Sequence, residues 1–247
     1  MELVDLKNRK ILVTGASSGI GREVSILLSK LGATVVLCGR DEQELVKTRK
    51  LMNEPNKHQI QTFDVTDYQR YPEVFNEIIK DEVKMDGFVH CAGIGKAIPL
   101  RVVKHSDIMN ILETNYVSFI ELLQIFSKKK YSSGGSIVVM SAVSAHYPLR
   151  CMTIYSASKA ALETSVQTLA LEMAHLNFRI NCVIPGIIDT RMTRIVDDHT
   201  LNALSSKQLF GIGKPEDVAN MVAFLLSDAS KFITGRSMYV DGGMLGQ

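Results

Sequence analysis

Residues 14–21 read TGASSGIG, and they separate a short apolar run from an amphipathic segment. Gly15, Gly19 and Gly21 follow the spacing G-x-x-x-G-x-G, at the start of a predicted helix near 20–30. Glycines at a strand-to-helix turn let the backbone bend tightly and approach a pyrophosphate, which then lies at the helix N-terminus. The stretch therefore predicts a dinucleotide site at the first turn of an α/β fold. The Walker lysine is absent, which argues against phosphoryl transfer.

Outward from this turn, short apolar runs alternate with amphipathic segments along the chain. The runs are KILVTG from Lys10, TVVLCG from Thr34, IQTFDV from Ile60, GFVHCAG from Gly87, SIVVMSA from Ser136, RINCVIPG from Arg179 and SMYVDGG from Ser237. Helices are predicted near 20–30, 41–52, 67–84, 106–130, 155–175 and 215–227. Continuously apolar strands are typical of parallel sheets, and their alternation with helices indicates a doubly wound α/β sheet. We expect one domain over 1–247, with a loop of short helices near 191–214 as a substrate lid.

Composition limits the function classes. The chain has 247 residues, 46% hydrophobic and 22% charged, with a net charge of +2, so nothing favours a nucleic-acid partner. No apolar run is long enough to span a membrane, and the N-terminal sequence lacks the apolar core of a signal peptide. The four cysteines show neither paired spacing nor zinc-site spacing, which predicts free thiols, no metal and a cytoplasmic location.

The end of the second predicted strand, VVLCGRDEQEL, bears on cofactor choice. An NAD-preferring dinucleotide fold usually places an acid here, whereas this chain has Gly39 and then Arg40. A guanidinium pairs with a 2′-phosphate, so we expect NADP(H), with NAD(H) as the alternative and Ser17 as a further donor. Asp64 and Val65 are expected near the adenine. The other interpretations are that Arg40 is a surface residue and that Asp64 is a turn residue.

The stretch YSASK places Tyr155 and Lys159 at positions i and i+4 of a predicted helix, on one face. A neighbouring ammonium favours the anionic form of a phenol, whose pKa is ordinarily about 10. The pair therefore predicts a tyrosine that exchanges a proton near neutral pH. The alternative is an exposed lysine beside a half-buried aromatic ring.

Taken together, these motifs resemble the short-chain dehydrogenase/reductase family, including members similar to 3-oxoacyl-[acyl-carrier-protein] reductases, over nearly the full chain. The matching motifs are TGASSGIG, the AG of HCAG at Ala92 and Gly93, TNY around Asn115, YSASK, PGIIDT from Pro185 and VDGG from Val240. The resemblance implies a single Rossmann-like domain and hydride transfer between NAD(P) and a carbonyl or secondary alcohol.

The resemblance also implies roles for single residues. Tyr155 is the expected acid/base, and Lys159 would lower its pKa and hold the nicotinamide ribose hydroxyls. Asn115 would hold a water that links Lys159 to solvent, or it is a helix-kink residue. The expected cofactor-binding residues are Gly15, Ser17, Ser18, Gly19, Ile20, Gly21, Arg40, Asp64, Val65, Ala92, Gly93, Asn115, Tyr155, Lys159, Pro185, Gly186, Ile188 and Thr190.

Two positions depart from the family pattern. Cys91 replaces the asparagine that usually precedes the AG, which predicts a change in sheet packing. Ala142 stands where the family carries its substrate-orienting serine, and losing such a donor costs about 10²–10³ in rate. We expect Ser141 or Ser144 to supply a catalytic hydroxyl instead. The alternatives are a polar group of the substrate or a bound water, or a weakened enzyme that serves as an NADP-binding sensor or scaffold.

The partners implied are a small carbonyl or alcohol substrate and further copies of the chain. Expected pocket residues are Ile94, His146, Tyr147, Leu149 and Met192. Basic residues at Lys96, Arg150, Arg191 and Arg194 suggest an anionic substrate, with solvated surface charge as the alternative. The helices near 106–130 and 155–175 are expected to form a homotetramer or homodimer; the sequence names neither the substrate nor the physiological direction.

Overall fold

One parallel sheet lies at the centre of the computed structural model, which describes residues 4–193 and 198–246. Its seven strands follow the order β3-β2-β1-β4-β5-β6-β7. They are β1 Lys10–Thr14, β2 Thr34–Gly39, β3 Gln59–Thr62, β4 Met85–His90, β5 Ser132–Met140, β6 Phe178–Pro185 and β7 Ser237–Val240. Every neighbouring pair is parallel. The chain winds outward from β1 in both directions, and the predicted doubly wound, Rossmann-like α/β fold is confirmed.

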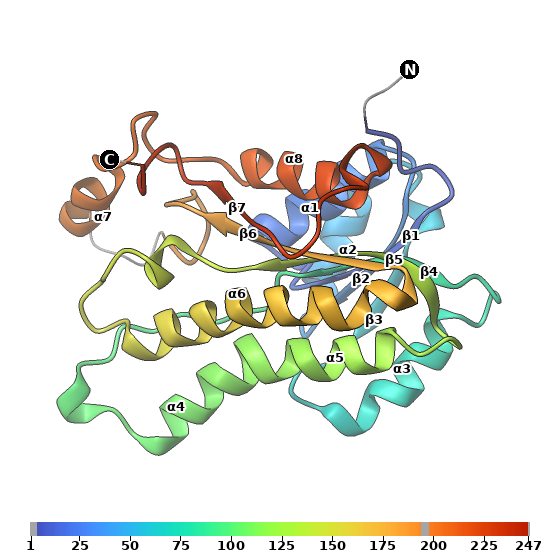
Figure 1. Cartoon of the computed structure of the whole chain (residues 1–247), viewed down its shortest axis with the longest axis horizontal. Helices are drawn as coiled ribbons and strands as arrows, with labels where there is room; N and C mark the ends of the chain where they lie inside the picture. Colours follow the sequence, from blue (N-terminus) through green and yellow to red (C-terminus); the bar gives the residue numbers. More distant parts are fainter. Residues whose placement is uncertain (1–3, 194–197, 247) are drawn as a thin grey trace.

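Helices cover both faces of the sheet (Figure 1). One face carries α1 Gly19–Lys30, α2 Glu42–Lys50 and α8 Pro215–Leu226. The other face carries α3 Tyr71–Ile78, α4 His105–Leu112, α5 Ser118–Phe126 and α6 Thr153–Met173. The remaining elements are α7 Asp198–Ser205, the π-helical turn η4 Glu113–Val117 between α4 and α5, and the short helices η1 Pro55–Lys57, η2 Tyr68–Arg70, η3 Leu100–Val102, η5 Val143–Ala145, η6 Ala174–Leu176 and η7 Asp228–Ser230. Part of the predicted lid, residues 194–197, lies outside the described residues.

The strands separate two apolar cores, because successive side chains of a strand point to opposite faces. In β1, Leu12 packs into the core on the α3–α5–α6 side, while Ile11 and Val13 pack into the core with α1 and α8. Each of the three is at most 1% exposed. Burial on both faces explains why the strands are continuously apolar in sequence. Among the described residues, no helix has the length and apolar character needed to cross a bilayer.

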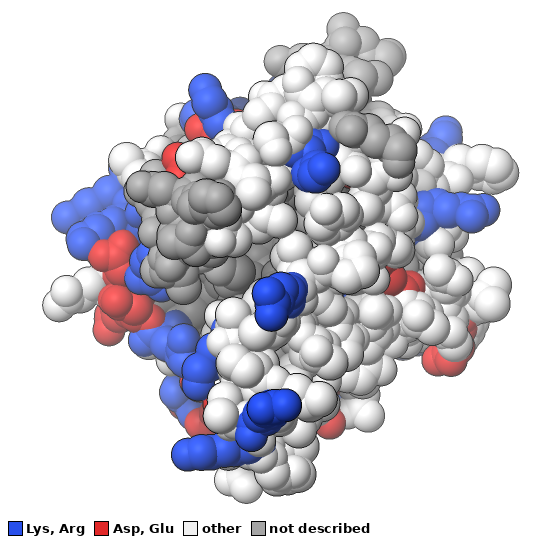
Figure 2. Space-filling view, turned by 90° about the vertical axis from the view of Figure 1, so that its left-hand side faces the viewer, with Lys and Arg blue, Asp and Glu red and all other residues white. Residues whose placement is uncertain are grey.

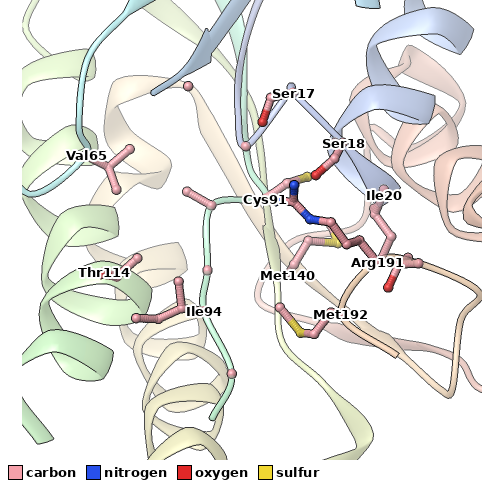
Figure 3. Close-up of a pocket in the computed structure, with 18 of the residues that line it drawn as sticks. Ser17, Ser18, Ile20, Val65, Cys91, Ile94, Thr114, Met140, Arg191 and Met192 are labelled. Atoms are coloured by element: carbon pink, nitrogen blue, oxygen red, sulfur yellow. The ribbon is translucent and has the colours of Figure 1, made fainter. Parts of the chain in front are cut away.

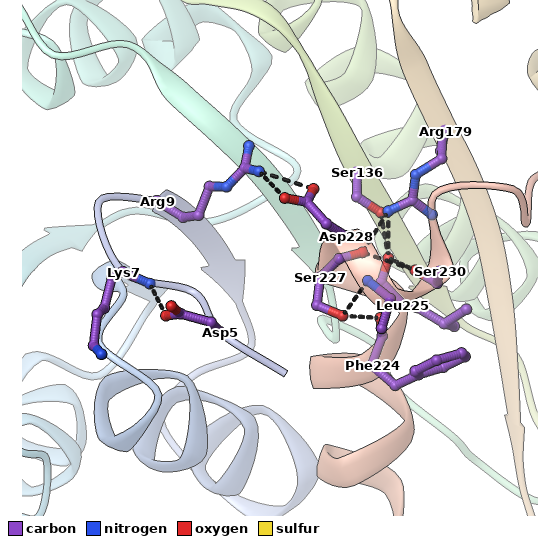
Figure 4. A network of polar contacts seen from close by, with 11 residues as sticks. Asp5, Lys7, Arg9, Ser136, Arg179, Phe224, Leu225, Ser227, Asp228 and Ser230 are labelled. Carbon is purple, nitrogen blue, oxygen red and sulfur yellow. Dashed lines mark hydrogen bonds and ion pairs between the residues drawn. The ribbon is translucent and has the colours of Figure 1, made fainter. Parts of the chain in front are cut away.

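Near the amino end of β6, polar side chains from β5, β6 and η7 satisfy the carbonyl groups at the end of α8 (Figure 4). Arg179 donates to the carbonyl oxygens of Leu225 at 2.9 Å and Ser227 at 3.2 Å. Ser136 Oγ and Ser230 Oγ also donate to Leu225, at 2.7 and 2.9 Å. The last carbonyls of a helix lack partners within it, so these bonds fix α8 to the sheet. The opposite edge, at the carboxyl ends of the strands, is left for the site.

Candidate active site

A cavity of about 470 Å³ opens at the carboxyl ends of the strands, where β1 and β4 lead the chain in opposite directions. Such a switch point is where doubly wound folds bind ligands. The predicted residues that line it are Gly15, Ser17, Ser18, Gly19, Ile20, Gly21, Arg40, Asp64, Val65, Ala92, Gly93, Ser141, Tyr155, Lys159, Pro185 and Thr190 (Figure 3). The predicted residues outside its lining are Asn115, Ser144, Gly186 and Ile188.

The glycine turn between β1 and α1 requires glycine for two physical reasons. Gly15 has φ +66°, and a Cβ on it would lie 2.8 Å from the Cys91 carbonyl carbon. Ser18, the N-cap of α1, makes no side-chain cap, and the first turn of α1 holds no acid. The first amides of α1 therefore retain hydrogen-bonding capacity toward the cavity, and this arrangement fits the diphosphate of a dinucleotide.

A side chain that sequence reasoning missed braces this turn from outside the cavity. Arg22 donates to the Ser17 carbonyl, and it forms an ion pair with Glu44 at 2.6 Å. Its Nε also donates to Thr48 Oγ1 at 3.0 Å, and that hydroxyl donates to the Ala16 carbonyl at 2.9 Å. The contacts join α1 and α2 behind the turn. Only the tertiary structure shows that Arg22 and Glu44 meet.

Arg40 lies at the rim of the cavity with a side chain that is 70% exposed. Its guanidinium is 3.6 Å from the Asp64 carboxylate, an exposed pair that contributes little stability by itself. Burial acts to raise the pKa of Asp64, but hydrogen bonds from Thr66 and the charge of Arg40 outweigh it, and the pKa lies below its ordinary value. Asp41 caps α2, accepting from Glu44 N at 3.1 Å. Arg40 thus remains accessible to a ligand.

Tyr155 and Lys159 lie side by side in the first two turns of α6. Lys159 Nζ is 5.7 Å from the centroid of the Tyr155 ring and donates to the Met140 carbonyl at 2.8 Å. Burial lowers the pKa of Lys159 to about 8, against a raising effect of Cys182 and Cys91. Burial thus makes the neutral form of Lys159 more accessible than that of an exposed lysine.

The expected lowering of the Tyr155 pKa does not occur in this structure. Burial raises the pKa of Tyr155 to about 12, because the anion loses its hydration in the cavity wall. Within the described residues, Lys159 donates its hydrogen bond to the Met140 carbonyl and none to the Tyr155 hydroxyl. The direction predicted from the i, i+4 spacing is therefore wrong, since spacing does not reveal the depth of burial.

The loop after β4 passes directly over this pair. A Cβ on Gly93 would lie 3.4 Å from Lys159 Nζ, and a Cβ on Gly95 would lie 3.5 Å from the Tyr155 ring. Asn115, in η4, holds the loop by accepting from Ile94 N at 2.8 Å and donating to Ile94 O at 3.0 Å. Asn115 is completely buried and belongs to a π-helical turn, which agrees with the helix-kink interpretation.

Neither serine near Ala142 presents a free hydroxyl to the cavity. Ser141 Oγ donates its proton to the Glu163 carboxylate, which also bonds His146 Nε2 at 2.8 Å. Ser144 Oγ is buried without a hydrogen-bond partner among the described residues, and it does not line the cavity. The structure therefore gives no support to the expectation that either hydroxyl replaces the missing one.

Several residues that line the cavity were not predicted from the sequence, namely Gly39, Phe63, Thr114 and Met140. Gly39 ends β2 and Met140 ends β5, so their position at the carboxyl ends of strands was the available signal. Cys91, expected only to alter sheet packing, lines the cavity as well.

Basic side chains on this side of the molecule do not form one continuous patch. Figure 2, which looks onto this side, shows isolated Lys and Arg side chains over the centre and others mixed with Asp and Glu along the left edge. Lys96 is paired with Asp107 at 3.0 Å. Arg191 lines the cavity, as do Ile94 and Met192. The other expected pocket residues, His146, Tyr147, Leu149 and Arg150, do not line it, and Arg194 lies outside the described residues.

Comparisons with known proteins agree with this geometry. A family model described as enoyl-(acyl carrier protein) reductase matches residues 15–245. The 3-oxoacyl-[acyl-carrier-protein] reductase of Thermotoga maritima is 33% identical over 245 residues, covering 97% of this chain and 99% of the relative. Glucose 1-dehydrogenase of Gluconobacter oxydans is 33% identical over 243 residues, covering 96% and 91%. The crystal structure of a short-chain dehydrogenase/reductase, glucose/ribitol dehydrogenase, from Brucella melitensis has a TM-score of 0.92 at 27% identity, with 98% of each chain covered. The chain therefore belongs to the short-chain dehydrogenase/reductase family of oxidoreductases, which use a nicotinamide cofactor.

Proposed function

We propose that the protein transfers a hydride between NADP(H) and a carbonyl or secondary alcohol, with Tyr155 as the acid/base. The observation that carries this proposal is the placement of Tyr155 and Lys159 in one cavity with the glycine turn of α1. Thr190 supports it, because its Cγ2 lies 3.4 Å from the position of a Cβ on Gly19. The loop after β6, the glycine turn and Tyr155 thus line one cavity, which suits a dinucleotide.

In this mechanism the bound nicotinamide supplies the hydride for reduction or accepts it for oxidation. Tyr155 donates its phenolic proton to the alkoxide that develops on the carbonyl oxygen, or accepts a proton in the reverse direction. Lys159 holds the ribose hydroxyls and, when protonated, stabilises the tyrosinate that remains. Asn115 fixes the loop at Ile94 and thereby positions Gly93 and Gly95 against the reacting pair.

The preference for NADP(H) over NAD(H) rests on Arg40. Its exposed guanidinium lies at the cavity rim beside Asp64, and it is suited to a 2′-phosphate. The test is a fluorescence titration of wild type and Arg40→Gln with NADPH and NADH. We expect Arg40→Gln to weaken NADPH binding by roughly 10-fold or more and to leave NADH unchanged. Equal binding of NADPH by both proteins would remove the basis for the preference.

We propose a small carbonyl or alcohol as substrate and a homotetramer or homodimer as the assembly. The outer face of α6 supports self-association, since the small side chains Thr164 and Thr168 and the 83%-exposed Leu171 lie on it. Four free thiols support a reducing, cytoplasmic location.

A second function, an NADP-binding sensor or scaffold, is favoured by one observation. Ala142 carries no hydroxyl, and Ser141 and Ser144 are not placed to replace it. The two functions differ in turnover and agree in cofactor binding. Binding of NADPH without oxidation of it, across ketone, sugar, steroid and acyl-thioester substrates, would favour the sensor.

A further inference from the structure

Arg191 is a cavity-lining cation that the proposed function does not use. It follows Thr190, whose Cγ2 lies 3.4 Å from the position of a Cβ on Gly19, the first residue of α1. The loop that carries Arg191 therefore packs against the glycine turn. Figure 3 shows the Arg191 side chain extending from this loop toward Ser18, and both residues line the same cavity.

Few basic side chains line the cavity beside the glycine turn. The cavity lining contains only three Lys or Arg residues in the described part of the chain: Arg40, Lys159 and Arg191. Arg40 pairs with Asp64 at the rim, and Lys159 donates to Met140 beside the tyrosine. Arg191 forms no ion pair with another described residue.

We propose that Arg191 binds the diphosphate of the nicotinamide cofactor opposite the amides of α1. A guanidinium offers planar, paired donors that match two phosphate oxygens, and helix amides supply donors without a full charge. This inference rests on the proposed function. It differs from the role of Arg40, because NADH and NADPH share the diphosphate, whereas only NADPH carries the 2′-phosphate.

The experiment measures the Kd of NADPH and of NADH by fluorescence titration at low salt. It compares wild type with Arg191→Gln, Arg191→Lys, Arg40→Gln and the control Arg101→Gln, which removes an exposed charge that does not line the cavity. We expect Arg191→Gln to weaken both cofactors by a similar factor, roughly 10-fold or more. Arg191→Lys should retain part of the affinity, Arg40→Gln should affect NADPH alone, and Arg101→Gln neither.

Thermal unfolding of each variant, measured in parallel, reports whether the fold is retained. Unchanged Kd values for both cofactors in Arg191→Gln would overturn the inference while leaving the proposed function intact. If the Kd values were unchanged and the KM for a carboxylate- or phosphate-bearing carbonyl substrate rose, the inference would be overturned and Arg191 would instead face the substrate. Failure of wild type to bind either cofactor would overturn the proposed function and the inference together. A smaller dependence of log Kd on salt for Arg191→Gln, with both cofactors, would add support.

Discussion

Ser141 and Ser144 flank Ala142, and their surroundings decide what each hydroxyl can do. The Ser141 hydroxyl donates to the Glu163 carboxylate, which in turn bonds the partly exposed ring of His146. Ser144 is 6% exposed and unpartnered within the described chain. The sequence could not distinguish a hydrogen-bonded serine from an unpartnered one, because the partner of a hydroxyl depends on the tertiary structure.

Restoring the hydroxyl at position 142 should raise turnover. We expect Ala142→Ser to increase kcat by about 10- to 100-fold, since a donor to the carbonyl oxygen stabilises charge that develops in the transition state. Steady-state kinetics with NADPH and the best carbonyl substrate provide the measurement. The control is Ser144→Ala, which should change kcat little. A kcat that is unchanged in Ala142→Ser and strongly reduced in Ser144→Ala would show that Ser144 supplies the hydroxyl.

His90 should make the fold acid-sensitive. Its ring is completely enclosed between Thr14 Oγ1 at 3.1 Å and Ser118, and burial lowers its pKa from 6.5 to about 3. Between these values the unfolded chain binds the extra proton, so stability is full above pH 6.5 and falls as pH drops toward 3. One such group changes the free energy of unfolding by at most about 1.4 kcal/mol per pH unit.

Urea unfolding at pH 7 and at pH 4.5 checks this for wild type and His90→Asn. We expect wild type to lose more stability between the two pH values than His90→Asn loses, whatever the variant's stability at pH 7. The same loss in both proteins would show that His90 does not account for the acid sensitivity.

Among the elements, the segment from α4 to α5 shows where sequence patterns stop being informative. A single helix was predicted near 106–130, and helical structure runs from His105 to Phe126. The π-helical turn at 113–117 was not predicted, because its cause is tertiary. Asn115 bonds the backbone of Ile94 on one side and Ser158 Oγ at 2.9 Å on the other. The spacing of apolar residues along the helix does not reveal these hydrogen-bond partners.

Asn115→Ala should destabilise the loop after β4 and the site together. The change removes three hydrogen bonds and leaves the partners unpaired, so we expect a loss of about 2–4 kcal/mol in the free energy of unfolding. Ser158→Ala removes one of these three bonds and the bond from Ser158 Oγ to the Tyr155 carbonyl, and it should cost about 1–2 kcal/mol without releasing the loop at Ile94. Denaturant unfolding measures both, and cofactor titration should show weaker binding only for Asn115→Ala. Equal, small losses would mean that the loop is held by other contacts.

For the whole molecule, sequence patterns predicted the fold, and they predicted only part of the chemistry of the site. The apolar runs at Lys10, Thr34 and Ser136 became β1, β2 and β5, because burial on both faces imposes a pattern that is visible locally. Parallel strands bring their carboxyl ends to one edge, so the residues after them met in one cavity. The pKa of Tyr155 could not be predicted, since it depends on how several elements enclose one phenol.

Self-association should depend on the outer face of α6. We expect Leu171→Arg to shift the protein toward smaller species, because an arginine in an apolar contact between copies would lose its hydration. Glu172→Gln, exposed on the same helix, is the matched control and should leave the assembly unchanged. Light scattering coupled to size-exclusion chromatography gives the mass of each. An identical mass for wild type and Leu171→Arg would place the interface elsewhere or show a monomer.

Tyr155 should move the proton in a hydride transfer that uses NADP(H). The test compares the rate of NADPH oxidation with a carbonyl substrate by wild type and Tyr155→Phe, together with the NADPH Kd of each. We expect Tyr155→Phe to lose about 10²–10⁴ of the rate while its Kd stays close to that of wild type. Tyr147→Phe, which changes a tyrosine outside the cavity lining, should keep the rate. Full activity in Tyr155→Phe would show that another group moves the proton.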